Sequence, residues 1–376
     1  MSPKTATGLQ PALYYHTLAN QQVLCTLCPH NCNIASGHAG ACGVRVNRGG
    51  YLFTGVGDRI ISVEVDPIEK KPLFHYLPGS RAYSFGTVGC NFRCQFCQNW
   101  EISQWPKLQP QDGPETEQHP SGAFCPAREE SPDDLFPGKH VKPSELIREA
   151  KRIGAESIAY TYTEPTIFFE LALETARGAS QSGLGNVFVT NGFIALEPLR
   201  EIAPYLSAAN IDLKSFRDHF YKRVCGARLQ PVLTAIEAYK RLGVWIELTT
   251  LVIPGLNDDE GELREIATFI RTTLGDDVPW HVTRFYPAYR MENHPMTPVE
   301  TLLRARDIGR QVGLRYVYIG NVPELEGGED TRCHGCHEPV IRRWGFQVIE
   351  NMLRAGRCPK CTEFVPGRWA VASSTG

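Results

Sequence analysis

The sequence lacks several features that would place it in an easily recognised class of protein. Its charges nearly cancel, with 39 basic and 41 acidic residues, so no general field attracts nucleic acid or an anionic membrane. No stretch reaches the roughly 18 consecutive apolar residues of a membrane-spanning helix. The first thirty residues contain no long apolar core of the kind that a signal peptide needs. We therefore expect a cytoplasmic protein with neither nucleic acid nor membrane as a partner.

Cysteine is too scarce for a disulfide scaffold, although it is the most informative residue type. The chain has 13 cysteines among 376 residues, well below the roughly 8–10% of a small disulfide-stapled secreted chain. In a reducing compartment, clustered cysteines indicate metal or redox chemistry. Cys125 and Cys225 are single. The others form an N-terminal group (Cys25, Cys28, Cys32 and Cys42), a central group (Cys90, Cys94 and Cys97) and a C-terminal group (Cys333, Cys336, Cys358 and Cys361).

Strand-like and helix-like segments alternate between the central and C-terminal groups. The spacing of apolar residues over 263–274 predicts one helix, and Ser144 is expected to cap another. Runs rich in Val, Ile, Tyr, Phe and Thr predict strands buried on both faces of a parallel sheet. These runs are residues 82–88, 157–162, 186–191, 208–213, 244–252, 280–286 and 316–320. Repeated βα units predict an α/β fold, and about six repeats, fewer than the eight of a TIM barrel, predict an open, partial (β/α)6 barrel.

We expect the barrel over residues 81–322, between an N-terminal cysteine module (1–80) and a C-terminal cysteine ribbon (323–376). Residues 105–142 contain seven prolines and many charges without a hydrophobic period, which predicts a mobile surface loop that includes Cys125. The sequence DPIEKKP (66–72) contains acidic and basic residues and two prolines. It predicts either a rigid, salt-bridged connector or a lid over the site.

The central group has C-x3-C-x2-C spacing directly after the first expected strand. Thiolates this close on one loop can all reach a compact cluster. With four irons and three protein thiolates, one iron stays open to another ligand, whereas structural zinc normally takes four protein ligands. A zinc loop with a distant fourth ligand is the alternative interpretation.

This spacing, with Phe96 just before the last cysteine, resembles the signature of the radical S-adenosylmethionine (SAM) superfamily. The resemblance implies a [4Fe–4S] cluster whose open iron binds the amino and carboxylate groups of SAM. It also implies one-electron cleavage of SAM to methionine and a 5′-deoxyadenosyl radical. No catalytic residue is assigned. The SAM contacts implied at the strand ends are Glu164, Asn191, Asp212 and Lys214, with His281 as a weaker candidate; each also fits a strand-end hydrogen bond or a helix cap.

The two flanking groups each have four cysteines. The N-terminal spacing, C-x2-C-x3-C-x9-C, fits either a closed zinc site or an additional iron–sulfur cluster, and does not choose between them. The C-terminal spacing, C-x2-C-x21-C-x2-C, is close to that of a zinc ribbon and predicts structural zinc. A second cluster or an empty site is the alternative there. We expect His30, His334 and His337 not to be ligands.

From about Cys25 to Trp369, the chain resembles the radical SAM member of the AmmeMemoRadiSam system. The resemblance is carried by the cysteine groups and by the motifs CTLCPHNC, GACGVRVN, SIAYTYTEPTIF, NIDLKSF and YVYIGNV. That family is similar to the activating enzymes of pyruvate formate-lyase. The resemblance implies Memo-type and AMMECR-type proteins as partners, and the chemistry needs a flavodoxin or ferredoxin as electron donor. It does not imply a substrate. The alternatives are a glycyl radical activator acting on a partner protein and a non-catalytic, metal-dependent binding module.

Overall fold

The segments expected as strands form one parallel sheet in chain order. The computed structural model describes residues 8–108, 136–323 and 325–370. The parallel strands are β9 (Arg81–Gly86), β11 (Ser157–Tyr160), β12 (Gly185–Thr190), β13 (Ala208–Asp212), β14 (Trp245–Val252), β15 (Trp280–Arg284) and β16 (Val317–Gly320). All seven expected strands are thus confirmed, with bounds that differ by a few residues.

An eighth strand, β8 (Ser62–Pro67), pairs antiparallel with β9 at one edge of this sheet. Among the described strands, β8 and β16 are the two edges and do not pair with each other, so the sheet is open. β8 comes from the range expected for the N-terminal module, which therefore contributes directly to the main sheet. The α/β class with parallel strands is confirmed.

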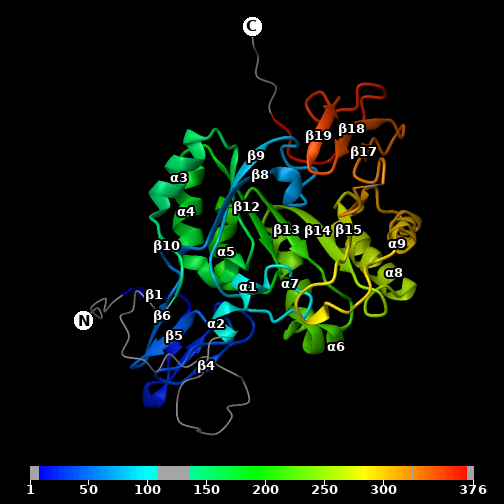
Figure 1. Ribbon diagram of the computed structural model, residues 1–376. Helices are drawn as coiled ribbons and strands as arrows, with labels where there is room; N and C mark the ends of the chain where they lie inside the picture. The colour runs from blue at the N-terminus through cyan, green and yellow to red at the C-terminus, as the bar shows by residue number, and fades with distance from the viewer. Residues whose placement is uncertain (1–7, 109–135, 324, 371–376) are drawn as a thin grey trace.

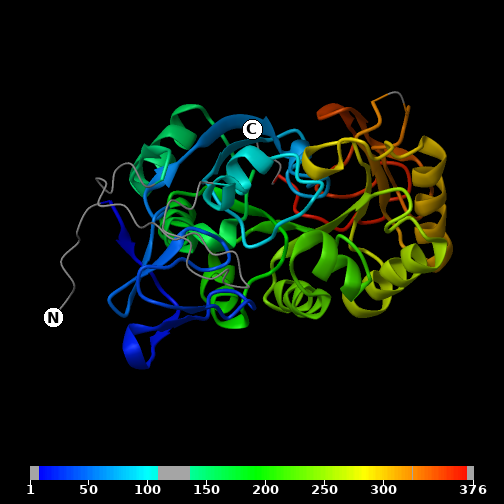
Figure 2. The same ribbon diagram turned by 60° about the horizontal axis from the view of Figure 1, so that its bottom comes forward.

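Helices follow the strands along the chain and cover the sheet (Figures 1 and 2). The longer ones are α3 (Pro143–Arg152), α4 (Phe169–Gln181), α5 (Leu196–Ile202), α7 (Leu229–Arg241), α8 (Glu260–Phe269) and α9 (Val299–Val312). The short ones are α1 (Trp100–Ser103), α2 (Trp105–Leu108) and α6 (Asp218–Phe220). Aromatic side chains lock the first strands together: the Phe85 and Tyr160 rings lie 5.1 Å apart, and the Tyr160 and Phe188 rings 5.3 Å. These edge-to-face contacts fix the register of the strands that carry the site.

Helix ends show where local signals decide the structure. Asp259 caps α8 by accepting the Glu262 N–H at 3.0 Å, and a π-helical turn then continues to Gly275, whose φ of 115° ends it. The expected Ser144 cap is wrong, because α3 begins at Pro143. Lys142 is the residue before that helix, and its N–H donates to the Glu145 carboxylate at 2.9 Å.

Small antiparallel sheets lie on opposite sides of the main sheet (Figure 1). The N-terminal strands are β1 (Gln10–Pro11), β2 (Tyr15–Thr17), β3 (Val23–Cys25), β4 (Asn33–Ile34), β5 (Arg45–Arg48), β6 (Tyr51–Thr54) and β7 (Arg59–Ile60). The C-terminal strands are β17 (Thr331–Arg332), β18 (Pro339–Trp344) and β19 (Gln347–Asn351). The N-terminal cysteine group lies at the end of β3 and in the loops up to β5, and the C-terminal group lies in the loops after β17 and β19.

The segment expected as a loop, 105–142, contains secondary structure at both of its described ends. It begins with α2 and ends near β10 (Lys139–His140), which pairs with β7. Residues 109–135, with Cys125, lie outside the described residues. None of the described helices is long and apolar enough to span a membrane.

Candidate active site

A cavity of about 250 Å³ lies at the carboxyl ends of the parallel strands. This edge is where ligands gather in parallel βα folds, because successive strand ends and their loops meet there. The predicted cluster and SAM residues that line the cavity are Cys90, Cys94, Cys97, Glu164, Asn191, Asp212 and Lys214. The structure thus brings together side chains that are spread over 125 positions of the chain.

The loop of the central group is held by backbone hydrogen bonds from a distant segment. The N–H groups of Arg93 and Gln95 donate to the carbonyl oxygens of Cys225 and Val224, at 2.7 and 3.0 Å. Both acceptors belong to a π-helical turn over Tyr221–Cys225. Such turns are rare and often occur at functional sites, and here the turn braces the cluster loop.

Lys107 also holds this loop, a role that no motif in the sequence indicates. Its ammonium group donates to the carbonyl oxygens of Cys90 and Phe92, both at 2.7 Å. Burial lowers the pKa of Lys107, and the nearby Cys90 thiol opposes that shift. Lys107 lies between prolines in the segment expected as a loop, and only its position in α2 reveals the contact.

The spacing of the central thiols fits a cluster better than a single ion. Two sulfurs bound to one zinc at about 2.3 Å cannot lie more than about 4.6 Å apart. Among the described residues, the only His, Cys, Asp or Glu group of three or more with all ligand atoms within 4.8 Å of one another is the C-terminal one. At least two of the three central sulfurs therefore lie more than 4.8 Å apart, as is expected when each thiolate binds a different iron.

The central thiols are also buried. Burial raises the pKa of Cys90 and of Cys97, and the Ser103 hydroxyl, 3.2 Å from the Cys97 sulfur, opposes the shift at Cys97. At Cys94 the largest cause of a raised pKa is a hydrogen bond with the Cys225 thiol. In the absence of a bound metal these groups are neutral thiols at ordinary pH.

Glu164 lies directly before a short 3-10 helix and is 1% exposed. Its Oε1 accepts from the Thr166 N–H at 3.0 Å, the Thr166 hydroxyl at 2.6 Å and the Thr190 hydroxyl at 2.8 Å. Its Oε2 accepts from the Asn191 N–H at 2.8 Å. Burial raises the pKa of Glu164 against these hydrogen bonds. A carboxylate has roughly two acceptor positions per oxygen, so Oε2 keeps capacity for one more donor.

Asn191 follows β12 and connects that strand end to the cluster loop. Its amide nitrogen donates to the Asn91 side chain at 2.8 Å and lies 3.8 Å from the Cys90 sulfur. Its side-chain oxygen accepts from the Phe193 N–H at 2.9 Å. Most of its hydrogen-bonding capacity is therefore used within the chain.

Asp212 and Lys214 form an ion pair at the end of β13. Lys214 Nζ lies 2.8 Å from Asp212 Oδ2 and 5.6 Å from the centre of the Phe96 ring. Burial alone would lower the pKa of Lys214, but Asp212 outweighs it and the pKa is raised. A permanent cation therefore lies on the wall of the cavity beside the cluster loop.

Tyr162 is a cavity residue that the sequence analysis missed. It has a φ of 64°, which is uncommon for a non-glycine residue. Its carbonyl oxygen accepts from the Asn99 amide at 2.7 Å, and its hydroxyl donates to Asp66 at 2.7 Å. Because Asp66 opens DPIEKKP, these contacts fit the connector interpretation of that segment. Tyr162 lies at the end of an expected strand, two residues before Glu164, and this position could have indicated that it lines the site.

His281 lies apart from the cavity. It is near the amino end of β15, with Nε2 2.7 Å from Glu247 Oε2 and its ring 5.2 Å from that of Tyr318. A residue at the start of a parallel strand lies at the edge opposite to its carboxyl end. The structure therefore does not bring His281 together with the other expected SAM contacts, and we do not propose it as one.

The C-terminal group has the geometry of a single-ion site. The sulfurs of Cys333 and Cys361 lie 3.4 Å apart and those of Cys336 and Cys358 lie 3.7 Å apart. Tetrahedral bonds of about 2.3 Å place sulfurs about 3.8 Å apart. These four cysteines can thus bind one metal ion. The described cysteines form no disulfide.

Comparisons with known proteins find similar sequences and similar solved structures. A model of the radical SAM superfamily matches residues 85–267. The uncharacterized protein MJ0808 of Methanocaldococcus jannaschii is 40% identical over 357 residues, which cover 94% of this chain and 98% of that protein. A domain of a pyruvate-formate lyase-activating enzyme from Bacteroides vulgatus is 18% identical, with a TM-score of 0.39, over 44% of this chain and 100% of that one. Streptococcus suis SuiB bound to S-adenosylmethionine is 12% identical, with a TM-score of 0.45, over 70% of this chain and 56% of that one.

The chain belongs to the same family as the M. jannaschii protein, and its residues 85–267 match the radical SAM superfamily. The matched region contains the central group and the four predicted SAM residues that line the cavity, whereas His281 lies beyond it. The match supports a radical SAM enzyme.

Proposed function

We propose that the chain cleaves SAM reductively and uses the resulting 5′-deoxyadenosyl radical to abstract a hydrogen atom from a substrate. The observation that carries this proposal is that the central thiols line the same cavity as Glu164, Asp212 and Lys214. A [4Fe–4S] cluster on Cys90, Cys94 and Cys97 supplies the electron for that cleavage when it is bound and reduced.

The residues of the cavity suit the groups of SAM. The remaining acceptor capacity of Glu164 Oε2 suits the ammonium group. The Lys214 ammonium suits the carboxylate, and Asp212, whose side chain is 33% exposed, can accept from a ribose hydroxyl. Apolar side chains complete the wall, notably Phe92, Phe96 and Leu251. They limit water around a reactive radical.

We also propose the finer family and the partners. The fold we expect is a partial (β/α)6 barrel with flanking cysteine modules, and the motifs favour the radical SAM member of the AmmeMemoRadiSam system. Memo-type and AMMECR-type proteins are then its partners, and a flavodoxin or ferredoxin is its electron donor. Co-purification of the tagged chain with each candidate tests this part.

The cleavage step is tested with protein reconstituted anaerobically with iron and sulfide, reduced with dithionite and given SAM. We expect release of 5′-deoxyadenosine and methionine, measured by liquid chromatography. The C90A/C94A/C97A variant should release neither, whereas a C125A control should match the unchanged chain. Equal release by the triple variant would contradict the proposal.

A further inference from the structure

We infer that the N-terminal group, Cys25, Cys28, Cys32 and Cys42, holds an iron–sulfur cluster rather than a structural zinc ion. The sequence left these two possibilities open. The inference goes beyond the proposed function, because SAM cleavage at the central group is possible with either metal here.

The four thiols of the group converge at the end of a small hairpin. Cys25 ends β3 and Cys32 precedes β4, and the Cys25 N–H donates to the Cys32 carbonyl oxygen at 2.9 Å. The Ala41 N–H donates to the Cys32 sulfur at 3.4 Å, which brings Cys42 to the same place. Cys25 and Cys42 are 6% and 7% exposed. The group therefore has four buried or half-buried thiols and backbone N–H donors to sulfur, as metal–thiolate sites require.

The spacing of these thiols separates a cluster from a single ion. Sulfurs on one zinc lie within about 4.6 Å of each other, since each bond is about 2.3 Å. Over the described part of the chain, no three donor atoms outside the C-terminal group all lie within 4.8 Å of one another. No three of the N-terminal thiols can therefore share one ion as they are placed. In an iron–sulfur cluster the thiolates are distributed over separate irons, so wider spacing is expected.

The C-terminal group provides an internal comparison. It too has four cysteines, and its close sulfur pairs at 3.4 and 3.7 Å match one tetrahedral ion. The N-terminal group shares its wider spacing with the central group, the proposed cluster site. The chain thus has two kinds of cysteine site, which differ in sulfur spacing. The N-terminal group has the wider spacing of the proposed cluster site, not the close spacing of the C-terminal group.

The N-terminal group is also packed directly against the loop of the central group. His30 Nε2 donates to the Asn91 carbonyl oxygen at 2.7 Å. Gly89 has a φ of 94°, and a β-carbon built on it would lie 2.7 Å from Val44 Cγ1 and 3.1 Å from the Cys42 carbonyl oxygen, so this close approach favours glycine. Cys42 and Cys90 are therefore in adjoining segments.

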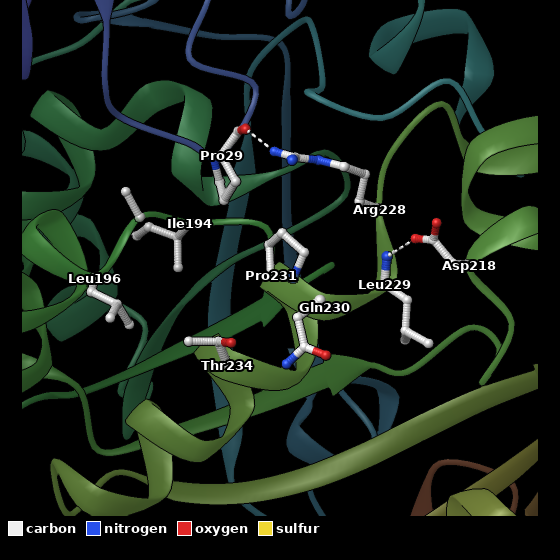
Figure 3. Close-up of a pocket in the computed structure, with 10 residues that line it drawn as sticks. Pro29, Ile194, Leu196, Asp218, Arg228, Leu229, Gln230, Pro231 and Thr234 are labelled. Atoms are coloured by element: carbon white, nitrogen blue, oxygen red, sulfur yellow. Dashed lines mark hydrogen bonds between the residues drawn. The ribbon is translucent and has the colours of Figure 1, made fainter.

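Further contacts hold the two loops in place. Pro106 packs on Gly43, where a β-carbon would lie only 2.6 Å from the Pro106 β-carbon, and the neighbouring Lys107 binds the Cys90 carbonyl oxygen. On the other side, Arg228 donates to the Pro29 carbonyl oxygen at 2.5 Å (Figure 3). The two cysteine groups are thus held in adjoining loops, and we expect the unpaired electrons of two clusters bound there to interact.

The test uses the C90A/C94A/C97A chain, anaerobically reconstituted with iron and sulfide and then analysed for metals and sulfide. An iron–sulfur cluster at the N-terminal group predicts about two or about four irons per chain, with as many sulfides, and an electron paramagnetic resonance signal after reduction. Adding C28A and C32A to this variant should abolish the iron. Zinc at the N-terminal group, with no sulfide, would overturn the inference, and so would iron that survives all five substitutions.

The unchanged chain provides a second test if the variant does not fold. We expect about one zinc per chain, at the C-terminal group, and more than four irons. After reduction, the resonance of the unchanged chain should be broadened relative to that of the triple variant, because the two centres interact. About two zincs per chain would overturn the inference, while 5′-deoxyadenosine release would still report separately on the proposed function.

Discussion

The Tyr162 hydroxyl donates to Asp66 Oδ2 at 2.7 Å and so ties the cavity wall to the segment that precedes the sheet. Asp66 also accepts from Lys71 at 2.5 Å and from Lys70 at 2.8 Å. Burial favours protonation of Asp66, but the hydrogen bonds from Lys70, Lys71 and Tyr162 outweigh it and hold its pKa well below the usual range. A non-glycine residue at positive φ costs about 1–3 kcal/mol. This network therefore holds Tyr162 in a conformation that it would not adopt alone.

Asp66→Asn should lower the free energy of unfolding by about 3–5 kcal/mol, because it leaves a buried lysine without its counter-charge. The Lys71 side chain is 2% exposed. Tyr162→Phe keeps the ring and removes one hydrogen bond, so about 1 kcal/mol is expected. Urea unfolding at neutral pH measures both, and equal losses would contradict this account.

The acid dependence of the same pair has a definite sign. The folded pKa of Asp66 lies below the unfolded value of about 3.9. The stabilisation is therefore present above that pH and is lost as the pH falls through the folded pKa. The difference in stability between the unchanged chain and Asp66→Asn should stay constant from neutral pH down to about pH 5 and shrink only in stronger acid.

Lys107→Met should weaken iron binding at the central group. The substitution removes both hydrogen bonds that the ammonium donates to the cluster loop, each worth about 1.5–3 kcal/mol as a bond from a charged group. Iron loss from the reconstituted protein in the presence of a chelator should become faster by at least about tenfold. Lys70→Met is the matched control, because its side chain is 44% exposed and surface ion pairs contribute about 0–1 kcal/mol. Unchanged iron retention in Lys107→Met would show that the loop does not need this cation.

His75 should make the fold sensitive to mild acid. Its Nδ1 donates to the Pro366 carbonyl oxygen and its Nε2 accepts from the Tyr318 hydroxyl, both at 2.6 Å. Burial lowers the pKa of His75 to about 4. The unfolded chain, with a histidine pKa of about 6.5, therefore binds the proton first, and stability falls as the pH falls from about 6.5 towards 4.

The expected loss from His75 between about pH 7 and about pH 5 is about 2 kcal/mol. Urea unfolding at the two pH values measures it. His75→Gln can keep one of the two hydrogen bonds but does not titrate, so the variant should lose about 2 kcal/mol less over the same interval. An identical pH dependence in the variant would assign the acid sensitivity to other groups.

The sequence predicted the parallel sheet, and most of the predicted site residues lie in one cavity, for a physical reason. Parallel strands place their carboxyl ends at one edge, so polar residues directly after each strand meet there. Glu164, Asn191 and Asp212 follow that rule. His281 was expected to contact SAM, but it lies at the start of its strand. The same rule places such a residue at the opposite edge of the sheet.

Contacts between distant segments could not be predicted from local patterns. The prolines around Lys107 indicated a loop, and only the packing of α2 on the cluster loop buries its ammonium. The π-helical turn that ends at Cys225 has no sequence signature, yet it pairs with the central loop. The Ser144 cap failed because Pro143 itself begins the helix and Glu145 accepts the preceding N–H.

The C-terminal group should bind about one zinc ion per chain, because its four sulfurs already have tetrahedral spacing. Cys361→Ser should lose that zinc and lower the melting temperature, since metal bound only by the folded state stabilises it. Lys360→Ala is the control: its side chain is 62% exposed and pairs with Glu338, so zinc should be retained. Metal analysis and thermal unfolding of the three proteins measure both effects. Iron and sulfide at this group, in place of zinc, would contradict the prediction and would mean that sulfur spacing does not distinguish the two kinds of cysteine site in this chain.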